Sequence, residues 1–419
     1  MGAFLAAAFL AAGCGSSGGG QSSVPAPPPS SNPTSAPGKK IAHVLILVQE
    51  NRTTDGLFNG FPGADTQSFG YTSKGKKILL QRRPLRSKLT PNNGYKQFLD
   101  DCDPQQGVCK MDGFDIPPVE GNPGAYVYQY VDPADVRPYW DIARQYVLAD
   151  RTFQTQGSGS FTAHQDLIAA GTQISSTESL IDFPSNFPLW GCDAPSGTKT
   201  SLITTKLEYR LYKGPFPCLT YRTLRDLLDA NGVSWKYYTP QFKSDLGGDL
   251  WNAFAAVKAV RYGSEWGTNV TWPETNVFKD ISNGALPAVS WVIPDFVNSD
   301  HPGANSDSGP SWVAQVVDAV GNSQYWDTTA VIVVWDDWGG FYDHVPPPLT
   351  DDAGGLGFRV PMLIVSPYAK RGYVSHTRYE FGSIVRFVED NWNLGRLGTT
   401  DVRANSIDDA FDFKSGPKP

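Results

Sequence analysis

Two adjacent carboxylates, Asp336 and Asp337, directly follow the apolar run from Ala330 to Trp335. The run has no polar alternation, which is typical of a central strand covered on both faces of an α/β sheet. Neighbouring strand side chains point to opposite faces, so the two acids converge only if the backbone bends, and Gly339 and Gly340 would allow a bend. Two carboxylates held together repel each other unless a proton or a cation lies between them. A bound divalent cation is therefore one interpretation of this segment, and a solvated turn is the other.

A second apolar run, from Ile41 to Val48, leads into Glu50 and Asn51. Carboxylate and amide oxygens are both ligands for hard cations. In open α/β sheets, ligands bind beyond the carboxyl ends of the strands, which is where these side chains would lie. We therefore interpret Glu50 and Asn51 as cation ligands or, alternatively, as the start of an ordinary loop.

Ser160 precedes a segment from Phe161 to Ala170 that predicts a short helix closed by Gly171. A serine at or next to a helix N-cap is commonly a capping residue. The alternative is a nucleophile that attacks phosphorus, because the free amides of a helix N-terminus favour phosphate oxygens. His164, one turn further on, is either a core histidine or a site residue, and its spacing does not distinguish the two.

Strands and helices alternate along the chain, and they would position these residues. Further strands are predicted over Val233 to Tyr238, Ala288 to Ile293 and Arg359 to Pro367. Helices are predicted over Val136 to Leu148, Thr223 to Ala230, Trp312 to Val320 and Tyr379 to Trp392. Phe58 to Gly94 has no clear period and predicts a loop. The alternation predicts an α/β fold with three layers, α/β/α, around a central and mostly parallel sheet.

The residues that precede this fold differ from it in composition. Residues 1–14 predict a signal peptide, because the apolar run from Ala3 to Ala12 leads into Cys14 in a pattern similar to a bacterial lipobox. Cys14 would then carry a lipid anchor to the membrane. Residues 15–38 are mostly Gly, Ser, Pro and Ala and predict a disordered linker, which leaves 39–419 as one catalytic domain. We expect an exported protein, either a periplasmic or outer-surface lipoprotein or a secreted one.

The charge of the chain bears on the kind of partner that it can bind. The 35 basic and 42 acidic residues give a net charge of −7, and the acids are spread along the chain, which argues against nucleic acid as a partner.

Beyond Cys14 the chain has four cysteines, an even number that predicts disulfides in an exported protein. Three pairings exist, and closeness in sequence favours Cys102 with Cys109 and Cys192 with Cys218. A zinc site is the alternative, but no Cys-x-x-Cys motif or nearby histidine supports it.

Five motifs occur in one order along the chain: Glu50-Asn-Arg52, Gly159 to His164, Asp300-His-Pro302, Asp336 to Pro347 and Gly357 to Pro367. Together they resemble the bacterial phosphoesterase family that includes the non-haemolytic phospholipases C and related acid phosphatases. The fold of that family is similar to alkaline phosphatase. The resemblance covers roughly residues 39 to 413.

The resemblance implies roles for individual residues. Glu50, Asn51, Asp336 and Asp337 match the positions that bind a divalent metal ion, with Ca, Mg, Mn and Zn all open. Ser160 matches the nucleophile and His301 a histidine near the phosphoryl group. Asp112 lies in Lys110-Met-Asp-Gly-Phe114, which matches a family motif, and is a candidate pocket residue.

One departure from the family pattern affects the expected mechanism. Family members commonly carry a histidine upstream of the Asp112 motif, but no histidine lies between His43 and His164 here. Asn93 or Tyr95 stands in its place. Protonation of the leaving group is then expected of His301 or His344.

The resemblance implies a metal-dependent phosphoric ester hydrolase of the phospholipase C type, which acts on a phospholipid or a small phosphate ester through a phosphoserine intermediate. An acid phosphomonoesterase that uses the same site is the alternative within enzymes. A surface binding protein that retains the fold and lacks the reaction is the alternative outside them.

Overall fold

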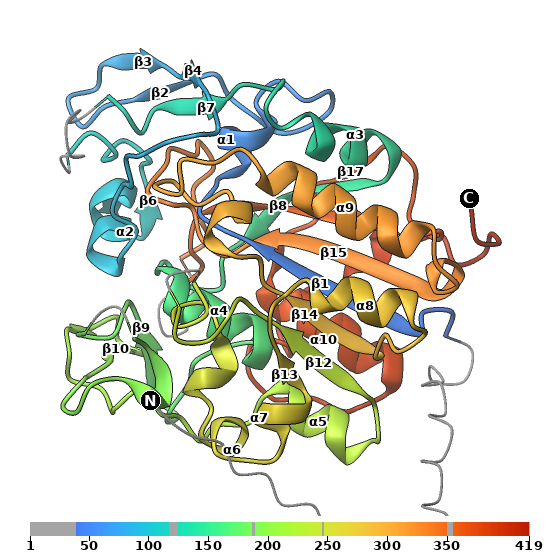
Figure 1. Ribbon diagram of the computed structural model, residues 1–419. Coiled ribbons are helices and arrows are strands. Elements are labelled where there is room, and N and C mark those ends of the chain that lie inside the picture. The colour runs from blue at the N-terminus through green and yellow to red at the C-terminus, as the bar shows by residue number, and fades with distance from the viewer. Residues whose placement is uncertain (1–38, 117–124, 187–188, 245–246, 350–354, 419) are drawn as a thin grey trace, which may run out of the picture. The chain divides into compact units, whose positions relative to one another are not determined.

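A nine-stranded sheet forms the centre of the part of the chain that the structure describes (Figure 1). This computed structural model describes residues 39–116, 125–186, 189–244, 247–349 and 355–418. The predicted signal peptide, the linker and Cys14 lie outside the described residues. The strands of the sheet are, in spatial order, β13 (Val270–Thr271), β12 (Trp235–Tyr238), β14 (Val289–Val292), β1 (His43–Gln49), β15 (Thr329–Trp335), β16 (Arg359–Val365), β8 (Val147–Phe153) and β17 (Tyr373–Ser375), with β18 (Tyr379–Glu380) also paired to β8.

The sheet is mostly parallel, as the sequence predicts. β1 is parallel to both of its neighbours, β14 and β15, and every residue of β1 and β15 is buried. Strands buried on both faces need apolar residues at every position, which explains their continuous apolar runs. β16 is the exception, because it runs antiparallel to β15 on one side and to β8 on the other.

Two groups of helices cover the two faces of this sheet. The first group is α3 (Arg137–Gln145), α8 (Asn276–Ser282) and α9 (Gly309–Gly321), and the second is α4 (Ser160–Ala169), α5 (Leu224–Ala230) and α10 (Phe381–Trp392). Figure 1 shows α8 and α9 on the viewer's side of the sheet and α10 on the far side. The predicted three-layer α/β/α architecture is confirmed.

Shorter elements make up much of the rest of the described chain. The helices are α1 (Thr54–Phe58), α2 (Tyr95–Cys102), α6 (Lys258–Arg261) and α7 (Glu265–Thr268). The strands form three ribbons, namely β2 (Phe69–Tyr71) with β3 (Lys77–Leu79), β4 (Gln81–Arg83) with β7 (Gln129–Val131), and β5 (Pro104–Gln105) with β6 (Val108–Cys109). A three-stranded sheet has the order β11 (Tyr209–Arg210), β10 (Ser201–Thr204), β9 (Glu178–Ile181).

Three sequence predictions need correction. The helix predicted to reach Leu148 ends at Gln145, because Val147 begins β8, whose apolar side chains are needed in the sheet. Tyr379 and Glu380 pair with β8 before α10 begins. The region from 58 to 94 contains β2, β3 and β4, and β4 has no local signal because its partner, β7, lies far along the chain.

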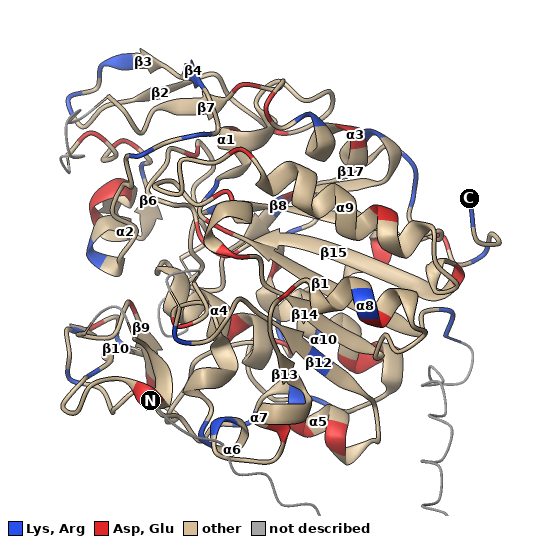
Figure 2. Cartoon of the chain, in the orientation of Figure 1, with Lys and Arg blue, Asp and Glu red and all other residues tan. Residues whose placement is uncertain are grey.

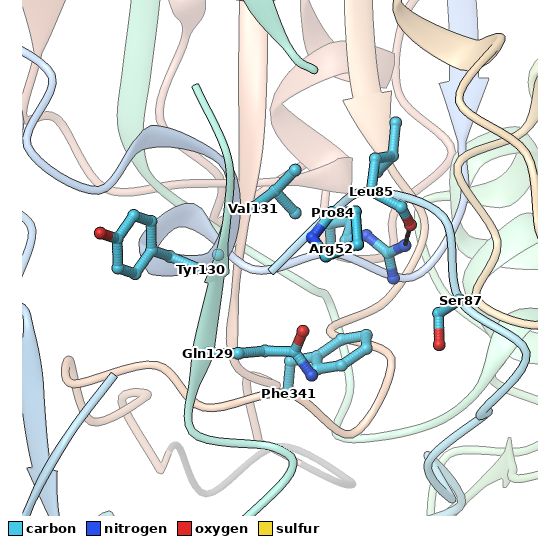
Figure 3. Close-up of a pocket in the computed structure, with 9 residues that line it drawn as sticks. Arg52, Pro84, Leu85, Ser87, Gln129, Tyr130, Val131 and Phe341 are labelled. Atoms are coloured by element: carbon cyan, nitrogen blue, oxygen red, sulfur yellow. Dashed lines mark hydrogen bonds between the residues drawn. The ribbon is translucent and has the colours of Figure 1, made fainter. Parts of the chain in front are cut away.

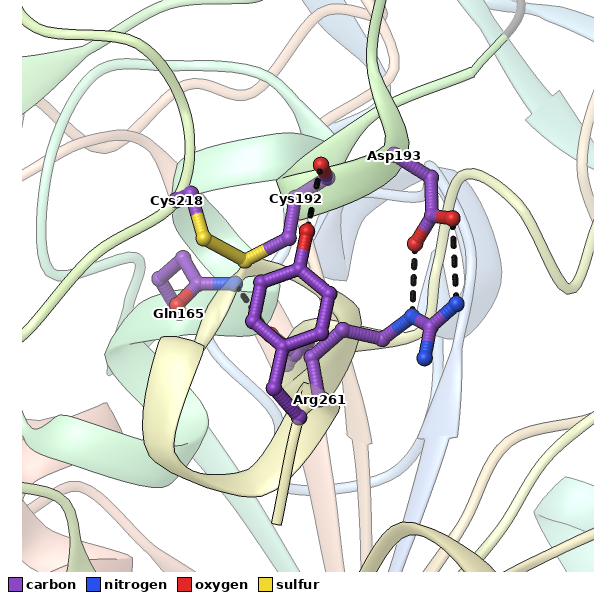
Figure 4. The surroundings of a disulfide bond; sticks show 7 residues. Gln165, Cys192, Asp193, Cys218 and Arg261 are labelled. Atoms are coloured by element: carbon purple, nitrogen blue, oxygen red, sulfur yellow. Dashed lines mark hydrogen bonds and ion pairs between the residues drawn. A yellow bond between two sulfur atoms is a disulfide. The ribbon is translucent and has the colours of Figure 1, made fainter.

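Both predicted disulfides are present. Cys102–Cys109 joins the end of α2 to β6, and Cys192–Cys218 closes a loop that contains the hairpin of β10 and β11. Figure 4 shows the second disulfide beside the ion pair of Asp193 with Arg261, whose nitrogen and oxygen atoms approach to 2.6 Å. Among the described residues, no helix has both the length and the apolar character that a membrane-spanning segment requires.

Candidate active site

The two central strands bring three carboxylates to one edge of the sheet. Gln49 at the end of β1 pairs with Trp335 at the end of β15, so Glu50 and Asp336 leave the sheet side by side. The Asp336 backbone amide donates to the Gln49 carbonyl, which extends this pairing by one residue. Glu50, Asp336 and Asp337 each have 0% of their surface exposed. Residues almost three hundred positions apart therefore meet because their strands are parallel neighbours.

A bend in the backbone turns both aspartates toward the same point. Gly339 and Gly340 have φ angles of +66° and +74°, which L side chains rarely adopt. A Cβ atom on Gly339 would lie 2.4 Å from the Asn51 carbonyl oxygen, so only glycine fits this approach. Asn51 then donates from its backbone amide to Asp336 (2.9 Å) and from Nδ2 to Asp337 (2.7 Å). The predicted bend at the two glycines is confirmed.

Ser160 is the first residue of α4, and its hydroxyl points at the carboxylates. Its Oγ lies 3.0 Å from Asp337 Oδ2 and 3.3 Å from Glu50 Oε2. The N-cap is Gly159, and no side chain caps the helix. A Cβ atom on Gly159 would lie 2.0 Å from the Phe183 ring, which explains why this position has no capping side chain. The first amides of α4 are consequently available to an anion at this site.

Two further side chains complete the cluster. Asn93 donates from Nδ2 to both oxygens of Asp337, at 2.8 Å each. His164, on α4, places Nε2 2.8 Å from Glu50 Oε1. Tyr95, the other residue considered for the missing histidine, instead packs against Phe98 and Tyr209. The sequence left His164 undecided, and the signal that could have placed it is its position one helical turn after Ser160, on the same face of α4.

The electrostatics of this cluster fit a bound divalent cation. Burial raises the pKa of Glu50 and Asp337 well above the usual range, and burial with the charge of Glu50 raises the pKa of Asp336 to about 8. No Lys or Arg among the described residues donates a hydrogen bond to these three carboxylates. Asn51 Oδ1 and Asp336 Oδ2 are buried without a partner. Oxygen atoms left unpaired beside unneutralised carboxylates are the donors that a hard cation requires.

His164 also belongs to a set that could contact the metal. Ligand atoms of Glu50, His164 and Asp336 all lie within 4.8 Å of one another. The Nε2 atom of His164 lies closer to Glu50 than to Asp336, at 2.8 Å against 3.9 Å. This geometry fits a histidine that orients Glu50 by a hydrogen bond.

Arg52 holds the backbone beside the site through hydrogen bonds. Its guanidinium donates to the Asn51 carbonyl (3.0 Å) and to the Leu85 carbonyl (3.2 Å), and it lies 4.9 Å from the centre of the Phe341 ring. Figure 3 shows this guanidinium in a small cavity together with Leu85, Gln129 and Phe341. Arg52 thus fixes the backbone of Asn51, whose side chain points at the aspartates.

A pocket of about 490 Å³ opens beside Ser160 and Asn93. Its walls are aromatic and come from two stacked pairs, Phe183 with Trp190 and Trp251 with Phe296, whose ring centres lie 5.6 and 5.9 Å apart. His301 also lines it. A concave, largely apolar pocket with a few polar groups at one end is the usual form of a ligand site.

The three remaining predicted site residues lie in different places. His301 is at the pocket, where burial and then the positive charge of Arg52 lower its pKa to about 4. His344 contacts Asp55 (2.8 Å) and Asp65 (3.2 Å), and no described contact links it to Ser160. Asp112 is half-buried near Lys110 and does not line the pocket.

His344 is displaced by a buried arginine. Arg359 is fully buried and needs anions around it, so Asp343 and Asp55 turn toward it, with Nε of Arg359 2.9 Å from Asp343 Oδ1. His344 follows Asp343 into this second cluster. Closeness to Asp337 in sequence therefore does not place His344 at the Ser160 site.

Residues 41–395 match the model of the phosphoesterase family. The chain belongs to this family. The resemblance seen in the motifs is thereby confirmed.

This phosphoesterase is similar to curated phospholipases C. It is 26% identical to the non-hemolytic phospholipase C of Pseudomonas aeruginosa, over 90% of this chain and 58% of that protein. It is 28% identical to phospholipase C B of Mycobacterium tuberculosis, over 49% of this chain and 46% of that protein. It is 23% identical to the non-specific phospholipase C1 of Arabidopsis thaliana, over 90% of this chain and 72% of that protein. The chain thus spans less than two thirds of the length of the first two relatives.

Among solved structures, the phosphoesterase aligns with a protein in the alkaline phosphatase superfamily from Vibrio parahaemolyticus. The alignment covers 88% of this chain and 72% of that chain, with 11% identity and a TM-score of 0.39.

Proposed function

We propose that this phosphoesterase is a metal-dependent hydrolase of phosphoric esters of the phospholipase C type, with Ser160 as its nucleophile. The observation that carries the proposal is the position of the Ser160 hydroxyl, which lies within 3.3 Å of two buried carboxylates and at the N-terminus of α4. The relatives named phospholipase C support the same reaction class.

Four residues, Glu50, Asn51, Asp336 and Asp337, would hold the metal ion. When bound, a divalent cation supplies charge neutralisation and makes a nearby hydroxyl more acidic. Asn51 Oδ1 and Asp336 Oδ2 are the unpartnered oxygens available for it. His164 and Asn93 orient Glu50 and Asp337 through hydrogen bonds of 2.8 Å each.

The serine forms and then loses a bond to phosphorus. Asp337 Oδ2, 3.0 Å from the Ser160 oxygen, is the acceptor toward which the hydroxyl proton points. Ser160 attacks phosphorus, the alcohol departs, and water hydrolyses the phosphoserine. The amides at the start of α4 donate to the phosphoryl oxygens throughout.

His301 is the histidine that this mechanism uses, in place of His344. It lines the same pocket as Ser160, and its lowered pKa keeps the ring neutral at neutral pH. A neutral imidazole both donates and accepts hydrogen bonds, so His301 can contact the leaving oxygen and the water that replaces it.

The aromatic pocket favours esters with a large organic group over small monoesters. Aromatic walls attract a quaternary ammonium group by cation–π contact, and p-nitrophenylphosphorylcholine carries this group whereas p-nitrophenyl phosphate does not. The phospholipase C hypothesis therefore predicts faster turnover of p-nitrophenylphosphorylcholine than of p-nitrophenyl phosphate. The reverse order would favour the acid phosphomonoesterase.

Replacement of Ser160 tests the proposal. Ser160→Ala should reduce kcat at least about 10⁴-fold, while the metal content stays unchanged. Ser366→Ala is the matched control, because Ser366 is equally buried and its hydroxyl donates to the Thr329 carbonyl at the opposite end of β15. An acid-quenched reaction should yield a phosphopeptide that contains Ser160. Turnover retained in Ser160→Ala would refute the nucleophile, and an inert wild type that binds phosphate would favour the binding-protein alternative.

A further inference from the structure

Asp182 joins three segments of the pocket wall, although it lies outside the proposed metal site. It directly follows β9, and its φ angle of +67° lies in the left-handed region, which aspartate tolerates better than bulkier residues do. Figure 2 shows other acidic segments, in red, around the tip of the β15 arrow, where Asp336 and Asp337 follow the strand. Asp182 takes no part in the steps proposed for the ester hydrolysis, so its contacts need a separate explanation.

The first contact is with the turn that presents the nucleophile. The Asp182 amide donates to Ser158 Oγ at 2.6 Å, and Ser158 lies two residues before Ser160. The hydroxyl of Thr162, in the first turn of α4, donates to the same oxygen at 2.6 Å. Ser158 thus joins Asp182 to the start of α4.

The second contact is with the loop that carries Asn93. A Cβ atom on Gly94, the N-cap of α2, would lie 2.9 Å from Asp182 Oδ1. The carboxylate therefore lies against the N-terminus of α2, where a negative charge is favourable. Asn93 directly precedes this N-terminus and donates to both oxygens of Asp337.

The third contact is with the aromatic wall of the pocket. Asp182 Oδ1 accepts from the Phe183 amide at 2.9 Å. A Cβ atom on Gly159 would lie 2.0 Å from the Phe183 ring, so this ring packs directly against the residue before Ser160. The Tyr209 hydroxyl, on β11, donates to the second carboxylate oxygen, Oδ2, at 2.7 Å.

A carboxylate suits this junction because it accepts hydrogen bonds at both oxygens. Burial raises the pKa of Asp182, and hydrogen bonds from the Tyr209 hydroxyl and from the amides of Phe183 and Tyr95 oppose this rise, because they favour the ionised form. Asparagine would keep one oxygen for the amides and could donate to the tyrosine hydroxyl. Glycine would keep the left-handed backbone and lose all of these side-chain bonds.

We propose that Asp182 is a positioning residue for the ester hydrolysis proposed above, on which this inference rests. Asp182 does not line the pocket, but Asn93, Ser160 and Phe183 do. By joining the segments that carry them, its carboxylate fixes the directions of the Ser160 hydroxyl and of the Asn93 amide, which in turn orients Asp337. A displacement of about 1 Å at a reacting group can cost about 100-fold in rate, so this junction acts on kcat.

Turnover of p-nitrophenylphosphorylcholine by the full chain at saturating Mn²⁺ tests the proposal. Asp182→Gly should lower kcat about 10- to 100-fold, and Asp182→Asn should recover most of this loss. Tyr209→Phe keeps the aromatic ring and removes one bond to the carboxylate, so it should lower kcat by a smaller factor, roughly fivefold. Asp280→Gly is the matched control, because Asp280 is half-buried on α8 and accepts from the Tyr238 hydroxyl at 2.6 Å. It should lower the Tm and leave kcat unchanged.

Calorimetry with Mn²⁺ gives a second readout that does not depend on turnover. Asn93→Ala should weaken Mn²⁺ binding roughly 10-fold, because Asp337 loses the side chain that orients it, and Asp182→Gly should weaken it by a similar factor. Because Asp182 acts through Asn93, the double variant should bind Mn²⁺ no more weakly than Asn93→Ala alone. Independent effects would instead multiply.

Two results would overturn this role of Asp182. The first is a kcat that stays at the value of the wild type and of Asp280→Gly in Asp182→Gly or, should that variant not fold, in Tyr209→Phe. The second is a multiplied loss of Mn²⁺ affinity in the double variant. A wild type that binds Mn²⁺ and hydrolyses no ester would contradict the proposed function, and the calorimetric comparison would then still decide whether Asp182 positions Asn93.

Discussion

Replacing Asp336 by asparagine should stabilise the protein when metal is absent. Asp336 is fully buried, its Oδ2 has no partner, and Glu50 lies beside it. Without a cation the folded protein must keep this carboxyl protonated at pH 7, or hold it ionised close to Glu50. Asparagine keeps an oxygen that can accept from the Asn51 amide, and its Nδ2 can donate to Glu50. The substitution thus removes the cost of protonating or charging this buried group and keeps the shape.

The size of the effect follows from the pKa. Burial and then Glu50 raise the pKa of Asp336 from 3.8 to about 8. A carboxyl with a raised pKa in the folded state contributes most stability below its unfolded pKa, and that contribution falls as the pH rises toward the folded value. The interval from the unfolded pKa of Asp336 to pH 7 is roughly three pH units, and each unit corresponds to about 1.4 kcal/mol. Metal-free Asp336→Asn should therefore have a free energy of unfolding up to about 4 kcal/mol above that of the wild type at pH 7.

Metal should remove most or all of this difference. A ligand that binds only the folded state at 100 to 1,000 times its Kd adds about 3 to 4 kcal/mol to the free energy of unfolding. The wild type should gain that amount, and Asp336→Asn should gain little. Thermal and urea unfolding with EDTA and with each of Ca, Mg, Mn and Zn would measure both differences. Asp327→Asn, an exposed acid next to β15, is the control and should change neither. A variant less stable than the wild type in EDTA would refute the reasoning.

Three further substitutions test the supporting contacts. His164→Ala should lower metal affinity roughly 10- to 100-fold by calorimetry, because it frees Glu50, and unchanged affinity would exclude an orienting role. His344→Gln should leave turnover unchanged and destabilise the protein more near pH 6 than near pH 9. Burial lowers the pKa of His344, but the hydrogen bond and charge of Asp55 raise it more, so the folded pKa lies above the unfolded pKa. The contribution of His344 to stability is therefore complete below the unfolded pKa and is lost as the pH rises through the folded pKa. Equal destabilisation at both pH values would contradict this. Gly339→Ala should cost at least about 1 to 3 kcal/mol of unfolding free energy and weaken metal binding, because the left-handed backbone and the close Asn51 carbonyl leave no room for a methyl group.

The central strands and the acids at their ends could be predicted because their cause is local. A strand buried on both faces must be apolar throughout, as β1 and β15 are, and parallel neighbours end at the same edge of the sheet. The sequence places Val147 and Leu148, the first two residues of β8, at the end of a helix, because Asp150 and Arg151 interrupt the apolar pattern of this strand. The partners that explain these charges are remote, since Asp150 accepts from the Asp65 amide and contacts His376.

The site residues that the sequence placed least well depend on contacts between distant segments. His164 lies on the correct face of its helix, but only the folded structure reveals that this face meets Glu50. His344 is seven residues from Asp337, and its placement is decided by Asp55 and by the buried Arg359. Asn93 reaches Asp337 from a loop with no pattern of its own. Spacing along the chain can place His164 on the same helix face as Ser160, but it does not identify the distant partner of any of these three residues.

An anomalous difference map from crystals grown with Mn²⁺ tests the central claim most directly. The account predicts one strong peak among the side-chain oxygens of Glu50, Asn51, Asp336 and Asp337, next to the Ser160 hydroxyl. A peak at the second cluster of Asp55, Asp343 and His344, whose ligand atoms also lie within 4.8 Å of one another, with none near Ser160, would contradict it.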